Sequence, residues 1–236
     1  MKRVQKEINL LKKRILELGG LVEERVYKAS QAYEQRDPEL AREVINGDFD
    51  IDQLEVDLEE DCLKVLALYQ PVAVDLRYII AILKINNDLE RIGDLAANLA
   101  SRAAYLAQIE PLDVDFDFAA MSERVKTMLH KSLDSLVNTD AQAAYEVFLL
   151  DDAVDEIHHT TYRKIEVAMV ESPTSSRALI NLLGISKTME RIADLATNIA
   201  EDVVYLTEGE IVRHRAWTHE ATVHQLHKED GGPTLD

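Results

Sequence analysis

The chain has 236 residues, of which 47% are hydrophobic and 30% charged, an ordinary composition for a globular protein. Its formal net charge of -18 would repel the phosphates of DNA and RNA, so we expect no nucleic-acid partner. The single cysteine, Cys62, excludes an intrachain disulfide. The charged N-terminus is unlike a signal peptide, and no stretch approaches the roughly 18 apolar residues of a spanning helix. We therefore expect a cytoplasmic protein that meets a membrane only through its partners.

The first part of the chain predicts three helices. Apolar residues recur at spacings of three and four across residues 3–35, which indicates an amphipathic helix. A second helix is predicted to begin at Asp37, a good N-cap that precedes Pro38, and to run to Tyr69. Pro71 marks a break, and a third helix follows. Its bundle-like seam consists of Ile79, Ile82, Ile85, Leu89, Ile92, Ala96 and Leu99.

The second part repeats this organisation after a break at residues 110–113. Helices are predicted over residues 116–138, from Asp140 to about 170, and from the Ser172-Pro173 break to about 207. We therefore predict an all-α fold of two tandem, pseudo-symmetric three-helix bundles, one in residues 1–110 and one in 111–214. Residues 215–236 contain Gly231-Gly232-Pro233, and we expect them to form a mobile tail.

One motif occurs twice, 100 residues apart. Residues 87–100 and 188–200 share the core E-R-I-x-D-L-A-x-N, which lies in a predicted helix of each bundle. Glu90 and Asp94 stand one helical turn apart, and so do Glu190 and Asp194. Asn98 and Asn198 extend the same side of each helix by one further turn.

Each repeat also has a second acidic pair on the preceding helix. Asp48 and Asp52 are four residues apart, as are Asp151 and Asp155. In an antiparallel hairpin about Pro71, Asp52 lies 19 residues before the break and Glu90 lies 19 after it. The same arithmetic pairs position 48 with 94, 155 with 190, and 151 with 194. The sequence thus predicts four carboxylates at one height in each of two hairpins.

Four facing carboxylates repel each other unless a proton, a basic side chain or a cation compensates. A hard cation such as Mg, Ca, Mn or iron suits an all-oxygen donor set, and each asparagine could bind it or orient a carboxylate. The alternative is a solvated acidic surface that pairs partly with Arg91 and Arg191. The predicted metal ligands are Asp48, Asp52, Glu90, Asp94, Asn98, Asp151, Asp155, Glu190, Asp194 and Asn198.

A second metal chemistry is also conceivable. Glu156 and His159 form one E-x-x-H element, of which di-iron bundle enzymes use two around a single four-helix core. The corresponding residues of the first repeat are Gln53 and Val56, so the element occurs once. This leaves a carboxylate-bridged metal enzyme as the alternative function.

With both E-R-I-[GA]-D-L-A-x-N-[LI]-A elements in view, the chain resembles the PhoU family of phosphate-signalling regulators over about residues 1–214. The resemblance implies two pseudo-symmetric bundles, each with a metal cluster, often of iron, on the carboxylates named above. It also implies an adaptor without enzymatic activity, which restrains the Pst phosphate transporter through its ATPase subunit PstB and damps the histidine kinase PhoR. Many members have a histidine after the second motif's aspartate, where this chain has Leu195.

Two simpler outcomes remain open at this point. The acidic rows could be solvated features of a plain helical scaffold. A homodimer is also plausible, because long amphipathic helices often leave apolar stripes to pair. The sequence fixes neither the native metal nor the subunit number.

Overall fold

The structure, a computed structural model, describes residues 2–212. The helices are α1 (Lys2–Glu34), α2 (Pro38–Asn46), α3 (Asp48–Tyr69), α4 (Ala73–Leu106), α5 (Phe118–Asn138), α6 (Ala141–Glu171) and α7 (Ser176–Glu208), with a 3-10 turn at Pro173–Ser175. No strand occurs in this part of the chain, so the predicted all-α class is confirmed. The predicted tail, residues 215–236, lies outside the described residues.

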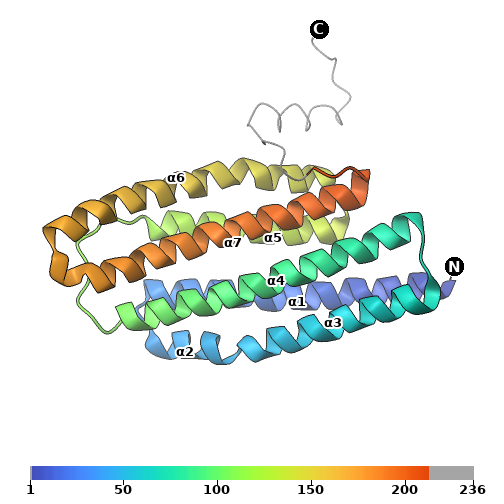
Figure 1. Ribbon diagram of the computed structural model, residues 1–236, viewed down its shortest axis with the longest axis horizontal. Coiled ribbons are helices and arrows are strands. Elements are labelled where there is room, and N and C mark those ends of the chain that lie inside the picture. The colour runs from blue at the N-terminus through green and yellow to red at the C-terminus, as the bar shows by residue number, and fades with distance from the viewer. Residues whose placement is uncertain (1, 213–236) are drawn as a thin grey trace, which may run out of the picture.

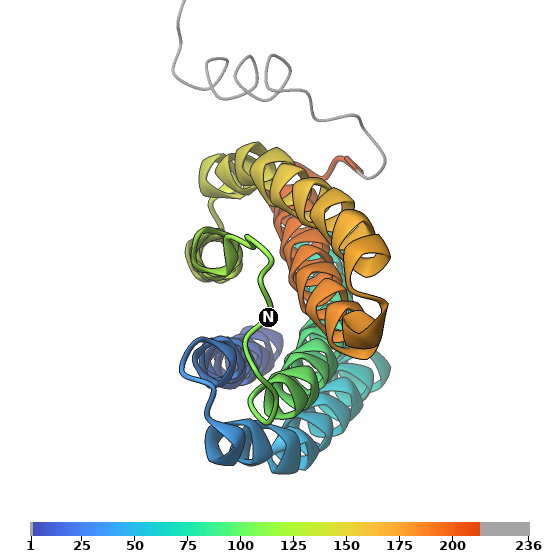
Figure 2. The ribbon, with the colours of Figure 1, turned by 90° about the vertical axis from the view of Figure 1, so that its left-hand side faces the viewer.

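The helices form two layers of similar organisation (Figure 1). One unit contains α1, α2, α3 and α4, and the other contains α5, α6 and α7. Figure 2 shows α4 and α7 packed against each other between the units, with α1 and α5 on the other side. The chain crosses from one unit to the other through residues 107–117.

The helix starts follow from local chemistry that the repeat preserves. The Asp37 carboxylate accepts hydrogen bonds from the backbone N–H groups of residues 39 and 40, at 2.9 and 3.1 Å. The Asp140 carboxylate accepts the equivalent bonds from residues 142 and 143, again at 2.9 and 3.1 Å. Both caps satisfy N–H groups that the first helical turn leaves unpaired.

The second helix of the first unit differs from the prediction. It is divided at Gly47 into α2 and α3, whereas the equivalent α6 is continuous. The Arg25 guanidinium donates to the carbonyls of Glu43 and Val44, at 3.3 and 3.0 Å. A β-carbon at residue 47 would lie only 1.6 Å from Arg25 Nη1, so a larger residue there would displace the end of this flexible side chain. The break places Asp48 at the start of α3.

The core is formed by the apolar seams that the spacings predicted. Residues of α1 and α4 such as Ile15, Leu18, Ile82 and Leu89 are fully buried. Cys62 is buried, and burial raises the pKa of its thiol to about 12. Within residues 2–212, no helix is long and apolar enough to span a membrane.

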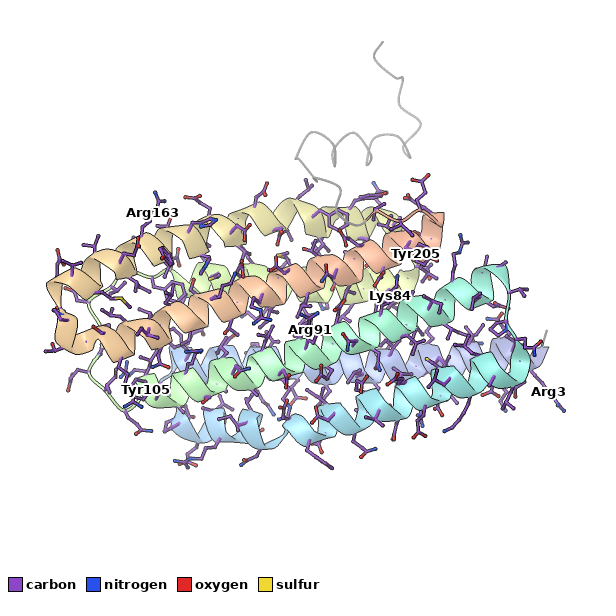
Figure 3. The ribbon with its side chains drawn as sticks, in the orientation of Figure 1. Arg3, Lys84, Arg91, Tyr105, Arg163 and Tyr205 are labelled. Carbon is purple, nitrogen blue, oxygen red and sulfur yellow. The ribbon has the colours of Figure 1, made fainter. Side chains whose placement is uncertain are left out.

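The two units meet along antiparallel α4 and α7. At one end Lys84 Nζ lies 3.2 Å from Asp202 Oδ1 and 4.8 Å from the centre of the Tyr205 ring (Figure 3). At the other end Arg102 Nη1 donates to Asn181 Oδ1 at 3.4 Å. These contacts join α4 to α7 and so connect the two hairpins that carry the acidic motifs.

Candidate metal centres

The first acidic cluster lies between α3 and α4. Burial raises the pKa of Asp48, and repulsion from Asp94 and Asp52 raises it further, while Arg25 opposes the shift. Burial likewise raises the pKa of Glu90, with added repulsion from Asp94, Asp52 and other carboxylates. The four side chains therefore lie close enough to repel each other, at the common height that the arithmetic predicts.

The second cluster lies between α6 and α7 and is more deeply buried. Burial, together with repulsion from Asp155 and Asp194, raises the pKa of Asp151 to about 7. Burial is also the main cause of the raised pKa values of Asp155 and Asp194, and repulsion from Glu190 adds to both. Asp151 lies within a continuous helix, whereas its counterpart Asp48 begins one and has Arg25 nearby. The two centres are therefore not electrostatically equivalent.

The basic partners differ from those considered on sequence grounds. Arg91 Nη1 lies 3.6 Å from Asp88 Oδ1, on its own helix and outside the cluster (Figure 3). In the second cluster Lys187 donates to both oxygens of Glu190, at 2.6 and 2.7 Å. Arg191 lowers the pKa of Asp194, although less than Lys187 does, and so favours its charged form. The i, i+3 spacing of Lys187 and Glu190 was the signal available in the sequence.

The two asparagines occupy less central places than the carboxylates. Asn98 is exposed, and its Nδ2 donates to the Asp94 backbone carbonyl at 2.9 Å. Its amide therefore caps a carbonyl of its own helix and does not orient a carboxylate. Asn198 is half-buried on α7. Both remain predicted ligands through their side-chain oxygens.

Sequence reasoning missed one further residue in each cluster. Glu55 on α3 raises the pKa of Glu90 through repulsion. His158 on α6 interacts electrostatically with Glu190 and Asp155, although burial is the main cause that lowers its own pKa. Each lies three residues after the second aspartate of its row, that is, after Asp52 and Asp155. That shared offset was visible in the repeat.

The donor chemistry of the clusters fits a hard cation, because each is composed mainly of carboxylates. In the first cluster the buried Asn86 also has an Oδ1 without a hydrogen-bond partner among the described residues. Across residues 2–212, however, no three Asp, Glu, His or Cys side chains converge closely enough to hold one ion in their present rotamers. Binding would require the partly exposed side chains to rotate toward each other.

The E-x-x-H element has a different environment. Glu156 is exposed on α6, accepts a hydrogen bond from Thr160 at 3.2 Å, and lies 3.7 Å from Arg163. Figure 3 places Arg163 on the outer side of that helix. A di-iron site of the bundle-enzyme type would instead need such carboxylates inside an enclosed helical core.

The fold and its sites define a class of protein: a tandem helical repeat whose two hairpins each present a cluster of carboxylates. A family profile described as "PhoU domain" matches this chain twice, over residues 15–103 and 118–203. The chain therefore belongs to the PhoU family.

Individual relatives agree with this assignment. The chain is 43% identical over 210 residues to the "Phosphate-specific transport system accessory protein PhoU homolog" of Aquifex aeolicus (strain VF5), an alignment that covers 89% of this chain and 95% of the relative. It is 37% identical over 209 residues to the protein of the same name from Pseudomonas aeruginosa, which covers 88% and 86% of the two chains.

Solved structures show the same architecture. The crystal structure of PhoU from Pseudomonas aeruginosa superposes with a TM-score of 0.84 at 36% identity, over 87% of this chain and 99% of the other. The phosphate transport system regulatory protein PhoU from Streptococcus pneumoniae gives a TM-score of 0.82 at 31% identity, over 89% and 99%. The predicted bundle fold is thus confirmed in solved relatives.

Proposed function

We propose that this protein is a non-enzymatic regulator that restrains phosphate uptake and the phosphate-starvation response. The observation that carries the proposal is the doubled hairpin of facing carboxylates in a chain of the PhoU family. Relatives are named as accessory proteins of the phosphate-specific transport system, which supports a role beside that transporter. Its cytoplasmic partners would be the PstB-type ATPase and a PhoR-type kinase.

The proposal includes metal ions on the two clusters. The ligands would be Asp48, Asp52, Glu90 and Asp94 in one centre, with Asn98 beside them, and Asp151, Asp155, Glu190 and Asp194 in the other, with Asn198 beside them. Mutual repulsion within each cluster supports it, because a cation would relieve that repulsion. Iron is favoured by the family resemblance, and Mn, Mg or Ca suit the same oxygen donors.

The test is complementation in a bacterium that lacks its own family member. Wild type should restore repression of a phosphate-starvation reporter in high phosphate, and a variant with Glu90→Gln, Asp94→Asn, Glu190→Gln and Asp194→Asn should not. Glu156→Gln is the matched control, because that carboxylate is exposed outside the clusters. Failure of wild type to restore repression would overturn the regulatory role. Full repression by the fourfold variant would mean that the clusters are not needed for the regulatory role.

Metal content and partner binding complete the design. Protein purified without a metal-affinity tag should contain metal in wild type and lose it in the fourfold variant. Pull-down with the purified ATPase and with the kinase's cytoplasmic part tests the adaptor role directly. Turnover of a phosphate ester, or oxygen consumption by iron-loaded protein, would instead favour the metal-enzyme alternative.

A further inference from the structure

Each acidic cluster has, apart from the asparagine beside it, a fifth polar side chain at a repeat-equivalent position. A shift of 103 residues relates Asp52 to Asp155, and the same shift relates Glu55 to His158. The first unit has a carboxylate at this position, and the second has an imidazole. The pseudo-symmetry of the two hairpins is thus broken at one donor.

The facing helix supports this fifth side chain in both units. Asn86 Nδ2 on α4 donates to Glu55 Oε1 at 3.0 Å and to the Glu55 carbonyl at 2.9 Å. On α7, Ser186 Oγ lies 2.9 Å from His158 Nδ1. Positions 86 and 186 are themselves related by the 100-residue shift of the motif. The side chains at positions 55 and 158 are therefore held by equivalent contacts.

The supporting residues are buried and polar in an otherwise apolar seam. Asn86 is 1% exposed and Ser186 is 0% exposed. A buried polar group destabilises the fold unless it is hydrogen-bonded, and each of these two side chains bonds the residue at position 55 or 158. Asn86 Oδ1 has no hydrogen-bond partner among the described residues, which leaves an acceptor beside Glu55 in the first cluster.

The contacts of Ser186 are compatible with a metal-binding imidazole. Ser186 Oγ also lies 3.8 Å from Met121 Sδ, a weak acceptor that can receive the hydroxyl hydrogen. Ser186 Oγ can then accept a hydrogen bond from His158 Nδ1–H, 2.9 Å away. In that tautomer the lone pair of His158 is on Nε2. Metal-binding histidines are commonly fixed in this way, with the second ring nitrogen donating to a supporting group.

We propose that Glu55 and His158 are the fifth donors of the two centres and that Asn86 and Ser186 position them. The first centre then has only oxygen donors and favours hard cations such as Mn²⁺ and Ca²⁺. The second has one imidazole nitrogen and favours Zn²⁺ more strongly than the first does. The inference rests on the metal-binding part of the proposed function and adds that the two centres differ in selectivity.

The test uses the full chain after removal of metal by a chelator. Zn²⁺ alone and Mn²⁺ alone are titrated into wild type, His158→Ala, Glu55→Ala and the control His159→Ala. His159 is the exposed neighbour of His158, at the place of Val56 in the first unit. We expect His158→Ala to weaken Zn²⁺ binding at one site by about tenfold or more and His159→Ala to leave it within about twofold. Glu55→Ala should weaken Mn²⁺ binding at the other site.

Nitrogen NMR of the histidine rings gives a second measurement, made on the wild-type chain. In wild type, Zn²⁺ should shift the Nε2 signal of His158 and leave its Nδ1 protonated, while Ca²⁺ should not. The signal is assigned by its loss in His158→Ala, so zinc taken up by other histidines does not interfere.

The outcomes separate the inference from the proposal beneath it. Wild type that binds neither metal overturns the metal-binding function. Wild type that binds Zn²⁺ with the His158 ring signal unmoved, or with His159→Ala as harmful as His158→Ala, overturns the fifth-donor inference alone. A higher Zn²⁺ affinity of the first centre in Glu55→His would support the fifth-donor inference further.

Discussion

Ile51 on α3 occupies the space that a side chain at Gly93 on α4 would begin to fill. A β-carbon at residue 93 would lie 2.9 Å from Ile51 Cδ1. The equivalent pair of the second unit is Val154 and Ala193, both fully buried. Compared with the first unit, the second has one carbon fewer on the α6 side chain and one carbon more on the α7 side chain. The total number of side-chain carbons at the contact is therefore the same.

Gly93→Ala alone should destabilise the protein modestly. Overpacking against Ile51 costs about 1–3 kcal/mol, and alanine's better helix propensity returns about 1 kcal/mol. The double variant Ile51→Val/Gly93→Ala reproduces the pair of the second unit and should regain or exceed wild-type stability. Urea unfolding measures both. A double variant less stable than Gly93→Ala would contradict this packing argument.

The ion pair of Lys84 with Asp202 should stabilise the junction between the units. The Asp202 side chain is 2% exposed, so Lys84→Met removes a charge partner from a buried carboxylate. We expect a loss of about 1–3 kcal/mol in the free energy of unfolding. Adding Asp202→Leu should restore most of it, since an apolar pair can replace a buried ion pair. If the losses caused by Lys84→Met and by Asp202→Leu, each measured alone, simply add in the double variant, the two residues are not coupled.

Metal-free protein should lose stability as the pH rises from about 4 to 7. The pKa of Asp151 is about 7 in the folded chain and 3.8 ordinarily, so across this range the folded state retains a proton that the unfolded state has released. The other raised carboxyls, including Asp155 and Asp194, act in the same direction. Thermal unfolding in chelator measures the effect.

Asp151→Asn should flatten this pH dependence and raise stability at pH 8 by roughly 1–2 kcal/mol, after allowance for partial solvent exposure. Asp152→Asn is the control, because Asp152 is the neighbour of Asp151 in the sequence and its carboxylate is exposed. A melting temperature of wild type that increases steadily from pH 5 to 8 would disagree with the raised pKa.

Lys187 should compete with a cation for Glu190, because its ammonium contacts both carboxylate oxygens. The first unit has Asn87 at the equivalent position. Lys187→Asn should therefore increase metal affinity at the second centre by up to about fivefold, the size expected from a partly exposed ion pair of up to 1 kcal/mol. Calorimetric titration measures it. Lower affinity in the variant would mean that Lys187 supports the bound state.

Much of the fold and of the cluster geometry was predictable from the sequence. Helix caps such as Asp37 and Asp140 act through bonds to residues two and three positions away, so their effect is local. The alignment of Asp52 with Glu90 follows from a constant rise per residue on both sides of the Pro71 break. The repeat then doubled each of these arguments.

Other features depended on contacts that the sequence does not display. At the division at Gly47, the guanidinium of Arg25 reaches the α2 carbonyls from a different helix. Helix rotation and crossing are set by packing, which periodicity alone leaves undetermined.

The sequence by itself determined the two helical hairpins and the height at which their carboxylates stand, because helical rise and capping are properties of neighbouring residues. Only the tertiary structure decided how the two centres differ. The burial of Asp151, the effect of Arg25 on Asp48 and the support of His158 by Ser186 each depend on groups from separate helices. Desolvation and directed hydrogen bonds act over a few ångströms, and folding brings these groups within that range.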